Sequence, residues 1–315
     1  MASTLANSGN RAYAAAHFAV EIDTLGDVGL FRSVEGGGMK ADVMTNQTGA
    51  SHVKFRQLGK PHFDDLKLQV GMASTQPFYK WISEFFTGQG TPKSGAIVAA
   101  DFYYQERARR TFSGGLIKEI GFPKLDASDK GAAYMSIGIA VEDIQFQVGS
   151  GQKIEQRFYM PNQKLWSSCN FRFTLSGFED SCKRVSKIDA FTIKQNVIEH
   201  HVGGYRAPFK FPSQIDFPNL TFYIPEADAA PFYKRATDGI ASGIGANNKL
   251  HGQIEVLDNT LNTTLASVAF LHSDIVSVTP DRSDASTEDI KQVKVEIYSE
   301  MMGFTYGSIG LGDLQ

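Results

Sequence analysis

The tetrapeptide Pro-Phe-Tyr-Lys occurs twice in the chain, at residues 77–80 and 231–234, which are 154 residues apart. A fold prediction that misses an internal repeat is wrong for the whole chain. We therefore apply the same offset to the rest of the sequence. It keeps an apolar alternation in three separate segments, which a chance tetrapeptide would not do. The matched pairs are Val34 and Ile188, Met39 and Ile193, Lys40 and Lys194, Val43 and Val197, Leu66 and Leu220, Leu68 and Phe222, and Val70 and Ile224. The sequence therefore predicts a tandem duplication of one domain.

Outside this central stretch the offset drifts, as loop insertions after a duplication would cause. Near the start it slips by one residue, so that Phe18–Ile22 falls on Phe171–Leu175. Near the end it lengthens, and Ile120 is placed against Ile275. Each half of the 315-residue chain is long enough to bury a core of its own.

The matched segments have the period of β-strands. Apolar residues alternate with polar ones in Phe18–Ile22 and Leu66–Val70, and in their counterparts in the second half, which indicates half-buried strands. A late strand is expected at 135–141 in the first half and at 293–297 in the second. The predicted fold class is mainly β, with two tandem domains, each a β-barrel or sandwich with one short helix.

The repeated tetrapeptide is expected to begin that helix. Proline is tolerated in a first helical turn because its missing N–H would have no partner inside the helix. Ser74 or Thr75 in the first copy, and Asp228 in the second, are candidate capping residues. Beyond them Phe78, Trp81, Ile82 and Phe85 form one apolar face. In the weaker second helix Phe232 and Ala236 continue such a face, and Gly239 interrupts it. The matched helix starts are Pro77, Phe78, Tyr79, Lys80, Pro231, Phe232, Tyr233 and Lys234.

These elements predict the domain organisation. The first domain is expected over 16–147 and the second over 169–315. A connector over 148–168 joins them, and residues 1–15 are expected to form an N-terminal arm that is either flexible or ordered by a partner.

The bulk composition narrows the class of protein. The net charge is −3 and the isoelectric point about 6.2, which does not favour a nucleic-acid-binding domain. The two cysteines are not in a CxxC motif, so a zinc site is unsupported. We find neither a signal peptide nor an apolar run long enough for a membrane span, and expect a soluble protein made in the cytoplasm.

No catalytic constellation stands out, so we expect no catalytic residue, cofactor or metal. His200 and His201 are adjacent and would point to opposite faces of a strand. Gly88–Gly95 has the glycines of a phosphate loop in the wrong order, and a turn after the helix is the better interpretation. The basic cluster Arg107, Arg109 and Arg110 favours a solvated strand face or a subunit contact over nucleic acid. An enzyme whose site residues converge from distant positions stays open.

Each half also contains a long polar excursion, at 45–64 and at 198–218. A long excursion in a compact domain needs a reason, and binding is a common one. Short apolar residues alternate in both, which predicts a projecting β-hairpin that could pair with a neighbouring subunit. The expected subunit-interface residues are His52, Lys54, Arg56 and Lys60 in the first excursion, and Tyr205, Arg206 and Lys210 in the second.

The order of these elements resembles the tube proteins of contractile phage tails and of related injection systems. In that family a first strand is followed by a glycine-rich, basic excursion, a strand, and a helix that opens with aromatic residues. The segments that carry the resemblance are Phe18–Ile22, Phe31–Gly36 and Phe78–Ile82 in the first half, and 202–212, 219–222 and 232–234 in the second. The departure is the duplication, because such proteins usually have one domain.

The resemblance implies a structural subunit of a tail tube rather than an enzyme. Six domains usually close the ring, so three of these chains would form a pseudo-hexamer. The rings would stack into a channel for DNA or an effector, held without specific binding. Sheath and baseplate proteins would be the partners, with no membrane involved, and the tube would lie in a virion made in a host cytoplasm.

Several alternatives stay open at this point. The chain could form a single terminal ring, as a tube initiator or baseplate hub with tandem tube-like domains. A two-domain β protein that binds a ligand or acts as an enzyme is more remote. The sequence does not distinguish a phage from a bacterial injection system, or three chains per ring from six, and it leaves open the cargo, the host and the residues that face the lumen.

Overall fold

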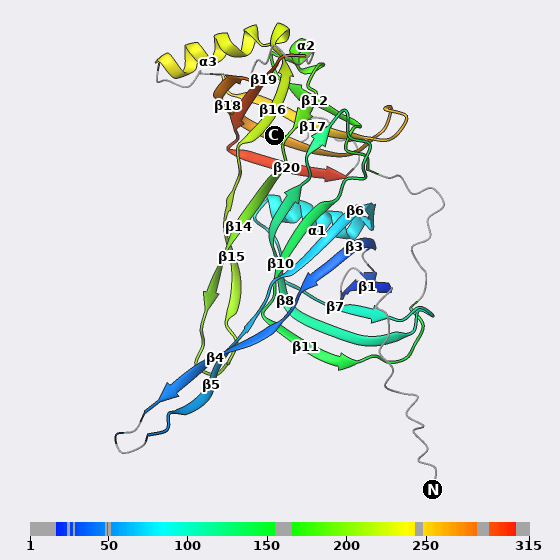
Figure 1. Ribbon diagram of the computed structural model, residues 1–315, viewed down its shortest axis with the longest axis vertical. Coiled ribbons are helices and arrows are strands. Elements are labelled where there is room, and N and C mark those ends of the chain that lie inside the picture. Colours follow the sequence, from blue (N-terminus) through cyan, green and yellow to red (C-terminus); the bar gives the residue numbers. More distant parts are fainter. Residues whose placement is uncertain are drawn as a thin grey trace.

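The computed structural model describes residues 17–23, 26–27, 29–47, 49, 52–154, 166–242, 248–281 and 290–306. The predicted N-terminal arm and much of the predicted connector lie outside these residues. The described chain is mainly β, as the sequence predicts, and is arranged as two units placed end to end (Figure 1). We call the unit from β1 to β11 copy 1 and the unit from β12 to β20 copy 2.

Copy 1 consists of strands around one helix. Its elements are β1 (His17–Ile22), β2 (Gly26–Asp27), β3 (Gly29–Gly36), β4 (Met39–Asn46), β5 (Phe55–Phe63), β6 (Leu66–Ser74), α1 (Gln76–Phe86), β7 (Lys93–Ala100), β8 (Glu106–Phe122), β9 (Leu125–Asp126), β10 (Met135–Ala140) and β11 (Asp143–Val148).

Copy 2 repeats the order of the longer strands and of the main helix, adds the short helices α2 and η1, and among the described residues has no counterpart of the two-residue strands β2 and β9. Its elements are β12 (Phe171–Leu175), α2 (Glu179–Cys182), β13 (Lys187–Ile188), β14 (Phe191–His200), β15 (Phe209–Asp216), β16 (Leu220–Pro225), the 3-10 helix η1 (Glu226–Asp228), α3 (Ala230–Ser242), β17 (Leu250–Leu257), β18 (Thr264–Pro280), β19 (Gln292–Tyr298) and β20 (Met301–Tyr306).

The strand pairings show that the two copies share one topology. In copy 1, β7 lies between β1 and β8, and β8 also pairs β10 and β11. In copy 2, β17 lies between β12 and β18, and β18 also pairs β19 and β20. The series continues with β10, β6 and β3 in copy 1, and with β19, β16 and β13 in copy 2. The tandem duplication predicted from the offset is therefore visible in the hydrogen-bonded sheets.

Local irregularities are repeated as well. The bulge of β8 opposite Gly138 and Ile139 has its counterpart in β18 between Ile275 and Ser277. A left-handed backbone occurs at Gly114, with a φ of 61°, and again at His272, with a φ of 52°. The second copy has thus kept the backbone at a position where the side chain has changed.

The register corrects one predicted match. Ile275 pairs with Ile297 as Ile117 pairs with Ile139, so Ile275 is the counterpart of Ile117 and not of Ile120. The reason is that the offset grows in two steps after the helix. It is 154 residues from β3 to α1, 157 at β7 and β17, and 158 from β8 and β18 onward, because copy 2 has longer connections there.

Both long excursions form hairpins, as predicted; β4–β5 projects beyond the body of the molecule, whereas β14–β15 extends from copy 2 along copy 1 (Figure 1). Strands β4 and β5 pair only with each other among the described residues and form a separate two-stranded sheet. Strands β14 and β15 pair in the same register 154 residues later, with a bulge at the equivalent place. An isolated two-stranded hairpin is marginally stable in water, so further contacts are expected for the β4–β5 hairpin.

Both helices begin at the repeated tetrapeptide, but their predicted caps are wrong. Thr75 is at the N-cap position of α1, yet its side chain makes no capping hydrogen bond. Asp228 lies in η1 before α3, where it pairs with Arg184 at 3.3 Å. The backbone carbonyl groups of Thr75 and Ala229 accept the first backbone hydrogen bonds of their helices. Gly239 does not end α3, which continues to Ser242.

A matched pair of glycines shows how closely the strands approach. A Cβ atom at Gly95 would overlap the carbonyl oxygen of Glu21 and the ring of Phe112. At Gly252 in copy 2 it would overlap the carbonyl oxygen of Thr174 and the ring of Phe270. Each phenylalanine ring therefore packs directly against the glycine in the adjacent strand, in space that a side chain would need.

We predict that Gly95→Ala and Gly252→Ala each lower the free energy of unfolding by about 1–3 kcal/mol, because the extra methyl group overpacks the sheet. Gly203→Ala is the matched control, since no atom lies within 4 Å of the Cβ position there. Denaturant unfolding of the three variants measures the effect. Equal stability of all three would contradict the close packing.

Candidate functional site

The junction between the copies is built on strand pairing. The β14 strand of copy 2 adds to β8 of copy 1 in antiparallel register, so the ten-stranded sheet contains strands from both copies. The paired residues are Phe191 with Phe122, Thr192 with Gly121, Ile193 with Ile120, and Lys194 with Glu119. A second bridge joins β13 of copy 2 to β9, with Ile188 opposite Leu125. Backbone hydrogen bonds therefore tie the copies together.

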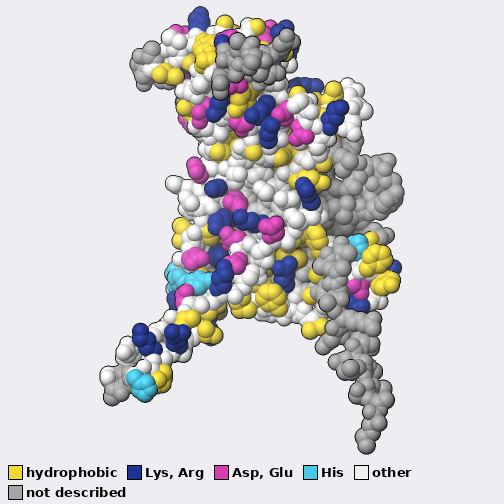
Figure 2. Space-filling view, viewed as in Figure 1, with side chains coloured by type: hydrophobic (Ala, Val, Ile, Leu, Met, Phe, Trp, Pro, Cys, Tyr) yellow, Lys and Arg dark blue, Asp and Glu magenta, His cyan; other side chains and the backbone are white. Residues whose placement is uncertain are grey.

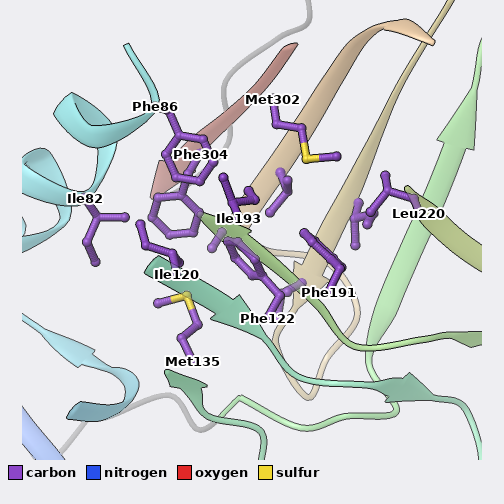
Figure 3. Close-up of a cluster of buried hydrophobic side chains, with 14 of the residues drawn as sticks. Ile82, Phe86, Ile120, Phe122, Met135, Phe191, Ile193, Leu220, Met302 and Phe304 are labelled. Atoms are coloured by element: carbon purple, nitrogen blue, oxygen red, sulfur yellow. The ribbon is translucent and has the colours of Figure 1, made fainter. Parts of the chain in front are cut away.

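Aromatic and aliphatic side chains fill the space around this pairing. Phe122 and Phe191 stack with their ring centroids 4.9 Å apart, and Phe304 of β20 lies 6.0 Å from Phe122. Figure 3 shows residues of α1, β8 and β10 meeting residues of β14, β16 and β20 in one buried cluster. Ile120 and Ile193 are fully buried at its centre. The two copies thus share one continuous hydrophobic core.

The helix of copy 1 completes the junction. Ser83 of α1 donates a hydrogen bond to the carbonyl oxygen of Phe304, at 3.0 Å. Tyr79 stacks on Tyr306 with a centroid distance of 4.1 Å, and Phe86 stacks on Phe304 at 6.2 Å. The helix that begins at the repeated tetrapeptide therefore holds the last strand of the other copy.

The hairpins of the two copies also meet. Arg206 donates to the carbonyl oxygen of Gly59 at 2.9 Å, and Lys60 lies 3.4 Å from the ring of His201. The backbone N–H of Lys210 donates to Glu142 at 2.6 Å. Lys and Arg side chains follow the projecting β4–β5 hairpin in Figure 2.

Some of the predicted interface residues lie at the contact between the hairpins, and the others are exposed. Lys60, Arg206 and Lys210 lie where the hairpins of the two copies meet. Tyr205 is exposed, and its ring meets Phe209 edge to face at 5.1 Å. The other predicted residues, His52, Lys54 and Arg56, are exposed on the β4–β5 hairpin. A subunit contact for all seven residues stays a prediction.

The helix-start residues have similar burial in the two copies and differ only at the tyrosine. Phe78 and Phe232 are fully buried, and Tyr79 is buried against copy 2. Tyr233 is half-buried, while both prolines and both lysines of the tetrapeptide, Pro77, Pro231, Lys80 and Lys234, are exposed. Sequence reasoning missed Phe122, Phe191 and Phe304, because an aromatic residue in a strand indicates burial without indicating its partner.

The basic cluster on β8 is paired within its own chain. Arg107 binds Asp101 at 2.7 Å, and Arg109 binds Glu21 at 2.6 Å and Glu106 at 2.8 Å. The hydrogen bond from Arg109 holds the pKa of Glu106 below its ordinary value, although burial opposes this shift. These guanidinium groups balance internal carboxylates, which agrees with the expected strand-face role.

Other chemistry is sparse in the described part of the chain. Nowhere there do three or more His, Cys, Asp or Glu side chains gather as metal ligands would. His200 and His201 are both exposed at the end of β14. Burial raises the pKa of the Cys182 thiol to about 12, which disfavours a reactive thiolate. In the described residues no helix has both the length and the apolar character needed to cross a membrane.

We predict that Glu106→Gln lowers the free energy of unfolding by about 1 kcal/mol at pH 7, because Arg109 loses a charge-assisted hydrogen bond. A carboxylate with a depressed pKa stabilises the fold above its unfolded pKa, and this contribution is lost as the pH falls through the folded value. The stability gap to the native chain should therefore close in acid. Glu35→Gln, on an exposed residue of β3, is the control, and a gap that is constant with pH would contradict the role of the charge.

Comparison with known proteins supports the sequence resemblance. Residues 14–145 match the family described as T4-like virus tail tube protein gp19. No curated protein matches the chain.

Solved structures also align, each over about half of the chain. The anti-feeding prophage cap, a tube terminating cap, is 18% identical with a TM-score of 0.36, and the match covers 50% of this chain and 97% of that chain. The sheath–tube complex of an extracellular contractile injection system is 19% identical with a TM-score of 0.35, covering 44% and 88%. Hcp1 from Flavobacterium johnsoniae is 11% identical with a TM-score of 0.27, covering 44% and 97%. The family match confirms the resemblance to contractile tail tube proteins over the first half of the chain.

Proposed function

We propose that this chain is a structural subunit of a phage-type tail tube or a related injection tube, with two tube-like domains per chain. The observation that carries the proposal is the β14–β8 pairing, in which one copy extends the sheet of the other. This contact is heterologous, because copy 1 offers β8 and copy 2 offers β14. Repeated heterologous contacts close into a ring when their rotation closes, and otherwise form an open filament.

Three chains per ring follow from the duplication. If a ring keeps the six domains usual for this family, three two-domain chains supply them, and the ring is a pseudo-hexamer. The domains would span 16–147 and 169–315, joined by a connector over 148–168 and preceded by an arm over 1–15. Stacked rings would then form a tube with a β-lined channel.

The hairpins would serve assembly. The β4–β5 hairpin projects from the body and is a two-stranded sheet of its own, so contacts with neighbouring subunits would stabilise it. His52, Lys54 and Arg56 are exposed on it and available to a neighbouring subunit. Lys60, Arg206 and Lys210, which already lie between hairpins inside one chain, would make similar contacts between chains.

The role would be architectural and not enzymatic. The channel would pass DNA or an effector without binding it specifically, while sheath and baseplate proteins would contact the outside of the tube. A net charge of −3 is compatible with passage, since a strongly basic lumen would hold DNA through many phosphate contacts. The particle would be a virion tail or an injection device.

We predict that the purified chain forms rings with a native mass of three chains, because each ring needs six domains. Native mass spectrometry gives the stoichiometry, and negative-stain electron microscopy distinguishes stacked tubes from single rings. Stacking would support a repeating tube subunit, and single rings of three chains would indicate a terminal ring of the same architecture. Six chains per ring would contradict the pseudo-hexamer, and a stable monomer would contradict the proposed function.

A further inference from the structure

The internal junction provides a template for the contact between two chains. Copy 1 uses one side, formed by α1 and the second half of β8, to hold β14 and β20 of copy 2. The equivalent side of copy 2, α3 and the second half of β18, holds no third copy. The equivalent of β14 and β20 in copy 1, namely β4 and β11, likewise faces no preceding copy. We call these two free surfaces the tail and the head of the chain.

The free edges have open backbone positions. In the described part of the chain, residues 274–280 of β18 pair only with β19. Their counterparts in β8 pair with β10 on one side and β14 on the other. At the head, β4 pairs only with β5 among the described residues, whereas β14 pairs with both β15 and β8. Each free edge is thus a strand that lacks the neighbour its counterpart has.

Residues buried at the internal junction have exposed counterparts on the free surfaces, as expected where the partner copy is absent. Ile193 is 0% exposed at the junction, whereas its counterpart Met39 is 55% exposed at the head. Phe304 is 5% exposed and its counterpart Phe146 is 57% exposed.

The tail shows the same difference on its helix. Phe86 is 9% exposed on α1, whereas Ile240, its counterpart on α3, is 60% exposed. Large apolar side chains gathered on a surface mark interaction sites. Here the internal junction also indicates which apolar residue would cover which.

We propose that the tail of one chain binds the head of a second copy in the register of the internal junction, and this inference rests on the proposed function. Met39 then lies opposite Val278 and Lys40 opposite Ser277, in antiparallel pairing of β4 with β18. Ile240 of α3 packs on Phe146 of β11, as Phe86 packs on Phe304 inside the chain.

A hydrogen bond follows from the same equivalence. Glu142 accepts from the backbone N–H of Lys210 inside the chain, at 2.6 Å. The counterpart of Glu142 is Glu300, and the counterpart of Lys210 is Arg56. Glu300 therefore accepts from the backbone N–H of Arg56 in the next chain. Its side chain is 53% exposed in the single chain, where it pairs with Lys249 at 3.4 Å, and a carboxylate can accept this further hydrogen bond beside that pair.

Disulfide trapping tests the register. Directly opposed residues in antiparallel strands have Cα atoms about 4.5–5.5 Å apart, within the range that a disulfide spans. In a Cys169→Ser background, we expect Lys40→Cys with Ser277→Cys to link most chains covalently to their neighbours after oxidation, seen as dimers and larger species on non-reducing gels. Cys182 is buried and stays unreactive.

Two further pairs serve as controls. Glu119→Cys with Lys194→Cys places the same geometry inside one chain and should form an intrachain disulfide, which shows that the register permits the bond. Met44→Cys with Ser277→Cys moves one thiol four residues along β4 to another exposed position and should give no cross-link above background.

The outcomes separate the two proposals. Rings that form without the 40–277 cross-link, while the 119–194 bond forms, overturn the proposed register and leave the proposed function standing. A chain that stays monomeric by native mass overturns the proposed function and this inference with it. As a second readout, Phe146→Glu and Ile240→Glu, both on exposed side chains, should each give folded monomers; unchanged rings in either variant would also overturn the inference.

Discussion

Backbone hydrogen bonding between β14 and β8 is the interaction on which the architecture depends. A strand at the edge of a sheet exposes unpaired N–H and C=O groups, and proteins cover such edges or use them for binding. Here the first residues of the β14–β15 hairpin cover the second half of β8. Once that edge is joined, Phe191 and Phe304 are placed against Phe122, and the two copies share one core. Linkage through backbone groups also explains why the pairing does not require identical side chains in the two copies.

Much of the fold could be predicted from the sequence because its signals are local. The period of two in Phe18–Ile22 and Leu66–Val70 depends only on which face of a strand is buried, and both segments are strands. The helix starts follow from proline near the beginning of an apolar face. The capping hydrogen bonds could not be predicted in the same way, because the sequence shows that a residue able to cap is near the helix start but not where its side chain points: Thr75 is at the N-cap without a capping bond, and Asp228 pairs with Arg184.

The junction between the two copies could not be predicted from local sequence patterns. Met39 and Ile193 occupy the same position in the repeat and have similar side chains, yet one is exposed and the other buried. Nothing near either residue in the sequence distinguishes them, since the difference comes from whether a neighbouring copy is present. The match of Ile275 to Ile120 failed for a related reason, because small insertions before β17 and β18 changed the offset without changing the alternation. The register was determined by pairing across the sheet.

The proposed contact between chains would be weaker than the contact within the chain. Where Phe191 stacks on Phe122 internally, the counterparts are Gly37 and Pro280, and where Tyr306 stacks on Tyr79, they are Val148 and Tyr233. Stacked aromatic pairs add about 0.5–1.5 kcal/mol each beyond the area they bury. In addition, the two copies of one chain are covalently linked, so each has a high effective concentration near the other. Duplication would thus make every second junction of a ring strong and permanent. The junctions between chains would be weaker. Chains joined in a wrong arrangement could therefore separate before the ring closes.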